Sequence, residues 1–242
     1  MENGGLQQTA AGWIRRATRV AVLTGAGISA ESGIPTFRDN NGLWRNFRAE
    51  DLATPQAFAR DPRLVWEWYN WRRSLIAQAE PNAGHQALVA LEQTKPGFTL
   101  ITQNVDGLHA RAGSRDPLLL HGDIWTLRCT RCGVAVEDHR ANLDPLPPVC
   151  GCGAMQRPGV VWFGESLPAE VWRKAEQAAR SAEVLLVVGT SALVYPAAGL
   201  IQVAQQAGAK TIEVNAAETP VSGQVDCSLR GRSGEILPRL LE

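Results

Sequence analysis

A short apolar run that ends in two glycines constrains the fold of this chain more than any other feature. Residues Arg19 to Leu23 form the run, and Thr24-Gly25-Ala26-Gly27 follows it. The pattern predicts a buried strand that leads into a glycine turn. The six residues from Gly25 to Ala30 match the Gly-x-Gly-x-x-Gly/Ala fingerprint, in which backbone N–H groups approach a pyrophosphate closely.

The fingerprint alone is a weak signal, because a glycine-rich turn after a strand is often only a tight turn. In a dehydrogenase, a second strand ending in Asp or Glu holds the ribose about 20 residues later, and this sequence has no such strand. A standard hydride-transfer enzyme is therefore disfavoured. Gly33 and Pro35 interrupt a helix and favour a loop over a bound cofactor.

Strand-like and helix-like segments alternate along the rest of the chain. Further apolar runs predict strands at 98–102, 184–188 and 211–214, and helical composition covers 169–182 and 197–207. This alternation predicts an α/β fold with a Rossmann-like, mostly parallel sheet, in which ligands bind at the carboxyl ends of the strands.

Polar residues follow two of the predicted strands. Gly189-Thr190-Ser191 comes after one and Asn215 after another. Each of these is by itself more often an ordinary cap or turn, but several polar strand ends at one edge favour a ligand crevice that binds ribose or phosphate.

Two pairs of closely spaced cysteines lie in a stretch that is poor in apolar residues. Cys129 and Cys132 form the first pair, and Cys150 and Cys152 form the second. Such spacing indicates one structural zinc ion bound by four thiolates, with a redox pair or simple packing as the weaker readings. A single residue, Gly151, separates the second pair, and we expect this glycine to adopt the unusual backbone angles that the short spacing requires.

We therefore predict one catalytic domain, 1–242, with a small zinc-binding insert at about 129–156. The Rossmann-like part would comprise about 1–128, with a helical segment at about 40–80, and 157–242. Lys plus Arg and Asp plus Glu number 24 each, so no net charge attracts nucleic acid or an anionic membrane. The start of the chain lacks the pattern of a secretory signal and the apolar runs are of strand length, so we expect a cytoplasmic protein that does not span a membrane.

One predicted helix carries an arginine on its apolar side. At about 100° per residue, the segment from Val65 to Gln78 separates into a polar and an apolar face, and Arg72 falls on the apolar one. The side chain can extend to solvent, pair with a buried carboxylate, or lie in a cleft that receives an anionic ligand.

Six motifs occur in an order that resembles the sirtuin family over nearly the whole chain: GAGISAESGIPTFR, TQNVDGLHARAG, LHG, the paired cysteines, GVVWFGE and VVGTS. The resemblance implies an NAD-dependent protein-lysine deacylase. In that reaction the acyl-lysine carbonyl oxygen attacks the ribose carbon that bears nicotinamide, and the products are nicotinamide and O-acyl-ADP-ribose. The resemblance also implies acylated-lysine proteins or peptides as partners, and we expect a monomer.

The resemblance also implies the residues of the cofactor site. They are Gly25, Ala26, Gly27, Ile34, Phe37, Arg38, Gln103, Asn104, Val105, Asp106, Gly189, Thr190, Ser191, Asn215, Ala216, Ala217 and Ser233. Within this set, Asn104 and Asp106 would orient the nicotinamide end, the residues from Gly189 onward would hold the adenosine half, and Ser233 would close over the adenine.

Among the four histidines, His121 in Leu120-His121-Gly122 matches the base of the family, which deprotonates a ribose hydroxyl. Imidazole titrates near neutral pH, which suits this role. His109 is expected to support structure, and His85 and His139 to have no part in the chemistry.

Two further similarities concern the substrate. Tyr69 and Arg72 resemble the Tyr-x-x-Arg motif of sirtuins that remove succinyl, malonyl and glutaryl groups, so Arg72 would pair with the acyl carboxylate while Tyr69 donates a hydrogen bond. The segment Val160-Val161-Trp162-Phe163-Gly164-Glu165, preceded by Gly159, resembles the peptide-binding strand of the family. Strand addition reads mainly the peptide backbone, so the sequence preference should be loose.

Three alternatives remain open from the sequence. The first is an acetyl-preferring deacetylase, and the second is a family member that transfers ADP-ribose to proteins. The third is a binding module whose cysteine insert contacts nucleic acid, which the balanced charge disfavours. Product analysis separates the two enzymatic reactions, because deacylation gives acyl-ADP-ribose and transfer leaves ADP-ribose on a protein.

Overall fold

The computed structural model describes residues 2–36 and 47–241. The helices are α1 (Glu2–Arg16), α2 (Gly27–Ala30), α3 (Ala49–Leu52), α4 (Pro55–Arg60), α5 (Pro62–Gln78), α6 (Ala83–Thr94), α7 (Leu108–Ala112), α8 (Ala169–Ser181), α9 (Gly199–Gln206) and α10 (Ser233–Leu241). The strands are β1 (Arg19–Thr24), β2 (Gly97–Thr102), β3 (Leu118–Leu119), β4 (Gly122–Cys129), β5 (Ala135–Glu137), β6 (Gln156–Val160), β7 (Val184–Val188), β8 (Lys210–Asn215) and β9 (Cys227–Arg230).

Six parallel strands form the main sheet in the order β3-β2-β1-β7-β8-β9. The chain starts in the middle with β1, builds outward through β2 and β3, and then returns to the other side of β1 with β7. This is the strand order of a doubly wound dinucleotide-binding fold, and its direction reverses between β1 and β7. The predicted α/β fold with a Rossmann-like sheet is confirmed.

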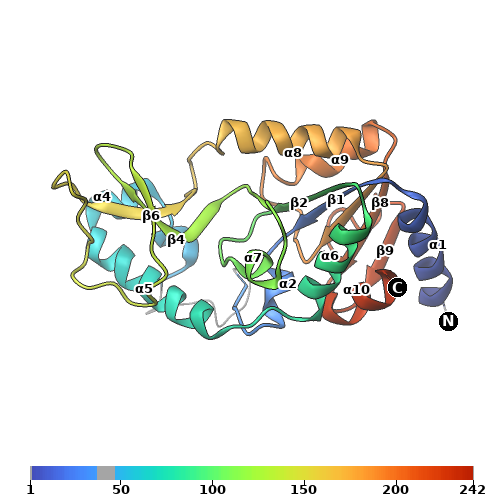
Figure 1. Ribbon diagram of the computed structural model, residues 1–242, viewed down its shortest axis with the longest axis horizontal. Coiled ribbons are helices and arrows are strands. Elements are labelled where there is room, and N and C mark those ends of the chain that lie inside the picture. The colour runs from blue at the N-terminus through green and yellow to red at the C-terminus, as the bar shows by residue number, and fades with distance from the viewer. Residues whose placement is uncertain (1, 37–46, 242) are drawn as a thin grey trace.

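Alternating side chains of β1 pack on two different layers of helices. Val20 and Val22 belong to a core with residues of α1, α6 and α10, whereas Ala21 and Leu23 belong to a core with residues of α8 and α9. Figure 1 shows these two layers on opposite faces of the main sheet. Because both faces are covered, the central strands are apolar throughout, which is why their runs were recognisable in the sequence.

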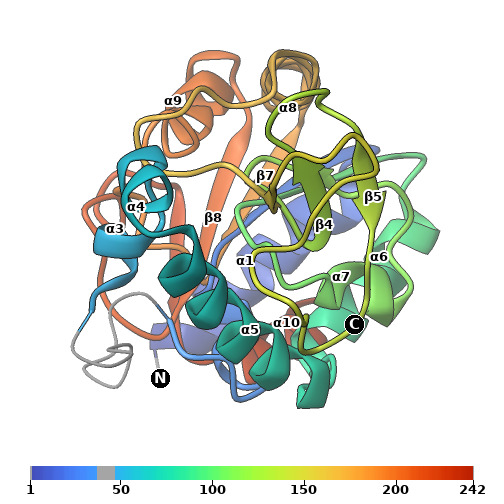
Figure 2. The same cartoon turned by 90° about the vertical axis from the view of Figure 1, so that its left-hand side faces the viewer.

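A second, smaller sheet consists of β5, β4 and β6 in antiparallel pairing. It begins at Gly122 and ends at Val160, so its strands extend beyond the predicted insert of 129–156 on both sides. Helices α3, α4 and α5 contribute to the same core, which contains Trp66, Trp68 and Trp162. Figures 1 and 2 show this part at one end of the molecule. Over the described residues, no helix combines the length and apolar character needed to cross a membrane.

Candidate active site

Four strand ends that the sequence marked as candidate sites come together at the carboxyl edge of the main sheet. Gly25 follows β1, Gln103 follows β2, Gly189 follows β7, and Asn215 ends β8. The ends of β1 and β7 are neighbours at the point where the strand order reverses. Ligands of doubly wound folds bind at this position, so the topology places these residues where a nucleotide would bind.

The glycines after β1 and β7 are required by direct backbone contact between the two loops. A Cβ atom on Gly27 would lie 2.7 Å from the carbonyl oxygen of Gly189, and one on Gly189 would lie 2.3 Å from the backbone nitrogen of Ile28. Gly189 also has a φ of +59°, which side chains disfavour. The Gly27 N–H donates to the Gly189 carbonyl at 2.7 Å. The glycine fingerprint therefore packs two loops together in addition to any contact with a ligand.

A buried polar network joins three elements at this edge. The Ser29 hydroxyl donates to the Asp106 carboxylate at 2.8 Å, and the Asn104 side-chain amide donates to Ser29 at 3.2 Å and to the Gly25 carbonyl at 3.1 Å. The Leu108 N–H donates to the other oxygen of Asp106 at 2.9 Å. Burial raises the pKa of Asp106, although these hydrogen bonds oppose the effect. The network fixes the orientations of Asn104 and Asp106, and their role toward nicotinamide stays a prediction.

Ser29, which was not predicted as a site residue, is only 1% exposed and lies at the centre of this network. It occupies one of the variable positions of the glycine fingerprint, so the motif itself gave no reason to select it. The available signal was a polar residue in a short buried segment that otherwise consists of glycine and apolar residues.

His121 is half-buried, and one ring nitrogen has a defined role. Its Nδ1 lies 2.9 Å from the backbone carbonyl oxygen of Gln103. Because a carbonyl only accepts hydrogen bonds, Nδ1 carries the proton and Nε2 keeps the lone pair of a base. Burial lowers the pKa of His121, with the Gln103 contact opposing it, so the neutral form prevails near pH 7. The Gln103 side chain donates to Thr190 at 2.9 Å and so links the ends of β2 and β7.

Two other histidines lie in the interior. The rings of His85 and His109 are 4.8 Å apart between centroids, and His109 Nε2 lies 3.0 Å from the Thr24 hydroxyl. Burial lowers the pKa of His85 to about 4 and that of His109 to about 3. Both are therefore neutral near pH 7. The fourth histidine, His139, is exposed.

The residues predicted to hold the adenosine half of NAD differ in burial and in their hydrogen-bond partners. Asn215 donates to the Ala217 carbonyl at 2.9 Å, and both Ala216 and Ala217 are exposed. Ser233 is buried at the start of α10 and donates to Glu31 at 3.0 Å. This bond ties the C-terminal helix to the loop after α2.

The remaining predicted cofactor residues differ in exposure. Ile34 is buried, whereas Ala26, Val105 and Ser191 are half-buried beside the same strand ends. Phe37 and Arg38 lie outside the described residues.

Helix α5 carries the two residues of the Tyr-x-x-Arg motif. Its first turn is fixed by the Asp61 side chain, which accepts from the Leu64 N–H at 2.9 Å. A pocket lies between α5 and the segment 34–36, and its wall includes Ile34, Trp68, Trp71, Arg72, Leu75 and Ile76. The wall also includes Pro35, Thr36 and Ala49, so among the described wall residues the Arg72 guanidinium is the charged group.

Arg72 is half-buried, and its guanidinium carbon lies 5.2 Å from the centre of the Trp68 ring. Burial lowers its pKa, while the nearby Tyr69 and Asp106 act in the opposite direction. Tyr69 is buried beside Arg72 rather than in the pocket wall. Its oxygen accepts from Trp162 Nε1 at 2.9 Å, and burial raises its pKa to about 12, so the phenol keeps a proton to donate.

The segment predicted to bind peptide is a strand only in part. β6 ends at Val160, and the following residues turn because Gly164 has a φ of +86°. Arg157 pairs with both oxygens of Glu165 at 2.6 and 2.8 Å, which closes this turn. Only Val160 of the predicted peptide-binding segment belongs to β6, and peptide binding by this segment stays a prediction.

Backbone contacts connect the same segment to the rest of the site. The Val161 N–H donates to the His121 carbonyl at 2.8 Å, and the Phe163 N–H donates to the Ala53 carbonyl at 2.9 Å. The Phe163 side chain is exposed, whereas Trp162 is buried.

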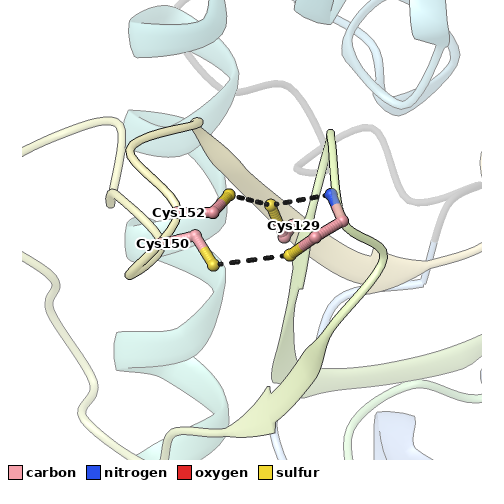
Figure 3. Close-up of side chains that lie close together, drawn as sticks. Cys129, Cys150 and Cys152 are labelled. Atoms are coloured by element: carbon pink, nitrogen blue, oxygen red, sulfur yellow. Dashed lines mark hydrogen bonds between the residues drawn. The ribbon is translucent and has the colours of Figure 1, made fainter.

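The four paired cysteines form one cluster at the end of the small sheet (Figure 3). Their sulfur atoms all lie within 4.8 Å of one another, with 3.4 Å between Cys129 and Cys152 and 3.8 Å between Cys132 and Cys150. Four sulfurs placed tetrahedrally about 2.3 Å from a zinc ion are about 3.8 Å apart, so the cluster fits zinc. The N–H groups of Cys132 and Arg131 lower the pKa of Cys129 to about 6, which favours the thiolate that binds metal.

The turn between Cys150 and Cys152 has a different origin from the expected one. The positive φ, +84°, belongs to Gly153, and Gly151 is not among the glycines with this conformation. The Gly153 N–H donates to the Cys150 carbonyl, and the Cys150 N–H donates to Ala154, both at 2.8 Å. The prediction that Gly151 supplies the unusual angle is wrong, but all four cysteines are positioned to bind one zinc ion.

Comparisons with known proteins agree with this geometry. The model of the Sir2 family matches residues 25–196. An NAD-dependent protein deacylase of Aquifex aeolicus is 53% identical over 92% of this chain and 94% of its own length, and one of Mycobacterium tuberculosis is 52% identical over 93% and 97%.

Solved structures of similar proteins give the same result. A Sir2 homologue in complex with NAD has 48% identity and a TM-score of 0.93, covering 97% of this chain and 92% of the other. A Sir2 protein in complex with a p53 peptide and NAD⁺ has 30% identity and a TM-score of 0.87, covering 97% of each chain. The motifs, the fold and these similarities together show that the chain belongs to the Sir2 family.

Proposed function

We propose that this Sir2 protein is an NAD-dependent protein-lysine deacylase that removes succinyl and malonyl groups in preference to acetyl. Curated relatives that share about half of its residues are named NAD-dependent protein deacylases. The strand ends at the reversal point of the main sheet support NAD as the second substrate, because a similar protein has been solved with it. Acylated-lysine peptides are the matching first substrate, since another similar structure contains a peptide.

The polar residues at the sheet edge have separate tasks in this reaction. NAD supplies the ribose carbon at which nicotinamide leaves and the hydroxyl that receives the acyl group. Asn104 and Asp106, held by Ser29, would orient the nicotinamide end. His121 Nε2 is the base that takes a proton from the ribose hydroxyl, because Nδ1 is occupied by the Gln103 carbonyl.

The acidic-acyl preference rests on one observation, the position of Arg72 in a pocket wall whose other described residues are uncharged and, apart from Thr36, apolar or aromatic. A carboxylate at the end of an acyl chain can form a charge-assisted pair with this guanidinium, and the protonated phenol of Tyr69 can donate a further hydrogen bond. An acetyl group offers neither contact. Loss of these contacts makes acetyl-lysine the poorer substrate.

An acetyl-preferring deacetylase is the second candidate, and the electrostatic influence of Asp106 on Arg72 favours it. Burial lowers the pKa of Arg72, and the Asp106 carboxylate lies close enough to oppose part of this effect. This carboxylate can balance the arginine charge without an acidic acyl group. The two candidates therefore differ in whether Arg72 serves the substrate or Asp106.

The deciding experiment compares acetyl and succinyl forms of one lysine peptide with the unaltered protein and with Arg72→Met. The proposal predicts that succinyl is preferred and that Arg72→Met reverses the preference by lowering kcat/KM for succinyl alone. Arg63→Ala, at an exposed position of the same helix, is the matched control and should preserve the preference. A preference for acetyl that Arg72→Met leaves unchanged would support the second candidate.

A further inference from the structure

Helix α5 has two faces with different partners. Arg72, Tyr69 and the pocket wall lie on one face, as described above. At about 100° per residue, Asn70 and Ser74 lie about 160° around the helix from Arg72, and Trp66 and Arg73 lie between, about 100–120° from it. The sequence shows Asn70 and Ser74 as part of a polar face, and an amphipathic helix normally turns such a face to solvent.

This face instead contacts the small sheet and the loop that follows β5. Asn70 exchanges two hydrogen bonds with Leu143: its amide donates to the Leu143 carbonyl at 2.9 Å, and its oxygen accepts the Leu143 N–H at 3.1 Å. The Ser74 hydroxyl lies 3.0 Å from the Asn142 side-chain oxygen, and Trp66 Nε1 donates to the Gln156 carbonyl at 2.8 Å. We call these contacts, together with those of Arg73, the α5 seam.

Arg73, like Trp66, is fully buried in the α5 seam, with an exposed fraction of 0%. Its guanidinium donates to three backbone carbonyls: Arg140 at 2.9 Å, Ile124 at 3.0 Å, and Asp138. The Asp138 carboxylate also lies 3.4 Å from it. Because the planar guanidinium donates to three acceptors held in fixed positions, α5 can rotate very little about its own axis.

The acceptors of the α5 seam belong to the part of the chain that carries the cysteines. Residues 138–143 follow β5, which pairs with β4, and β4 ends at Cys129. Gln156 begins β6, four residues after Cys152. These bonds tie the rotation of α5 to the cysteine-bearing sheet, whereas Arg111 of α7 adds a bond to the Ile76 carbonyl at 3.3 Å.

We propose that Asn70 and Arg73 are positioning residues for acyl-group specificity. They fix the rotation of α5 and thereby aim Arg72 and Tyr69 at the distal end of the acyl chain. This inference rests on the proposed acidic-acyl function. A longer acyl chain must meet Arg72 in a defined place, and displacement of about 1 Å is enough to weaken such a contact severely, whereas acetyl does not reach it.

The primary test is Asn70→Ala, which removes both bonds to Leu143 and leaves the buried Arg73 intact. We expect KM for a succinyl-lysine peptide to rise about fivefold or more while kcat/KM for the acetyl form stays within about twofold. Ser74→Ala should shift the same ratio in the same direction by a smaller factor, and it serves if Asn70→Ala does not fold. Gln78→Ala, exposed at the end of α5, is the control and should change neither substrate.

Parallel measurement of Arg72→Met separates the two proposals. If Arg72→Met abolishes a succinyl preference and both seam variants preserve it, the positioning role is wrong and the acidic pocket stands. If Arg72→Met changes nothing, the acidic pocket is wrong and the positioning role falls with it. If Asn70→Ala lowers kcat/KM equally for the succinyl and acetyl peptides and also lowers the melting temperature, the α5 seam only stabilises the fold and the positioning role is wrong.

Discussion

The phenol oxygen of Tyr69 accepts a hydrogen bond of 2.9 Å from the indole N–H of Trp162. This bond joins the helix that carries Arg72 to the segment that follows β6, where the peptide is proposed to bind. Because the oxygen accepts from Trp162, the phenol proton remains for another acceptor. The same atom therefore links the two halves of the proposed substrate site.

Tyr69→Phe should separate acyl selectivity from peptide binding. A hydrogen bond to a charged group contributes about 1.5–3 kcal/mol, so kcat/KM for succinyl should fall about ten- to hundredfold while acetyl changes little. The change also leaves the buried Trp162 N–H without its acceptor, which costs about 1–3 kcal/mol of stability. Steady-state kinetics with both peptides and urea unfolding measure the two effects.

The double variant Tyr69→Phe/Trp162→Phe is the control for this prediction. It removes both polar partners, so part of the lost stability should return, but the loss of succinyl selectivity should remain. Recovery of selectivity in the double variant would show that Tyr69 acts only through Trp162.

His121→Ala should lower kcat with every acyl group by about a hundredfold or more, the usual contribution of a general base. His139→Ala, at an exposed position, should have no effect. Since burial lowers the pKa of His121, its acid limb in the pH profile should lie below about 6.5, the ordinary histidine value. An acid limb above that value would contradict the neutral ring that burial favours.

The free energy of unfolding should decrease as the pH falls below neutral, because of His85 and His109. Their folded pKa values are about 4 and 3, whereas the unfolded chain binds these protons below about pH 6.5. Between pH 6.5 and 4 the unfolded state therefore binds more protons than the folded state. In that window each histidine lowers the free energy of unfolding by about 1.4 kcal/mol for every unit by which the pH falls.

Urea unfolding of His109→Asn at pH 7 and pH 5.5 tests this titration. The variant should lose less stability between the two pH values than the unaltered protein does. His139→Asn, whose side chain is 72% exposed, should behave like the unaltered protein. Equal pH slopes in all three proteins would remove His109 from the explanation.

Removal of the metal should destabilise the small sheet first. Four thiolates leave zinc no open position, so the ion contributes folding energy and not chemistry. Native mass spectrometry should find one zinc per chain, and Cys129→Ser should lower both the zinc content and the melting temperature. Cys227→Ser, which lies apart from the cluster, should retain the full zinc content.

The strands β1, β2, β7 and β8 were predictable because both faces of the main sheet are covered and each strand carries a run rich in apolar and β-branched residues. β3 has two residues and gives no pattern that a sequence can reveal. The cysteine spacing predicted the metal cluster for a similar reason, since the ligands are close in the chain.

Contacts between distant segments could not be predicted in the same way. Asn70 and Leu143 are 73 residues apart, so no local pattern shows that the polar face of α5 is covered. The sequence singles out Arg72 because its charge falls on an apolar face of the predicted helix. Arg73, which is fully buried, does not fall on that face, so the sequence gives no sign of its burial. Ser29 became visible only through Asn104 and Asp106, which reach it from the loop after β2.

The most direct test of the deacylase activity is mass spectrometry of the products from one succinyl-lysine peptide and NAD. The account predicts that nicotinamide, unmodified lysine peptide and succinyl-ADP-ribose appear in equal amounts, and that omission of NAD prevents all three. ADP-ribose attached to protein, with the succinyl group still on the lysine, would contradict deacylation and support transfer of ADP-ribose.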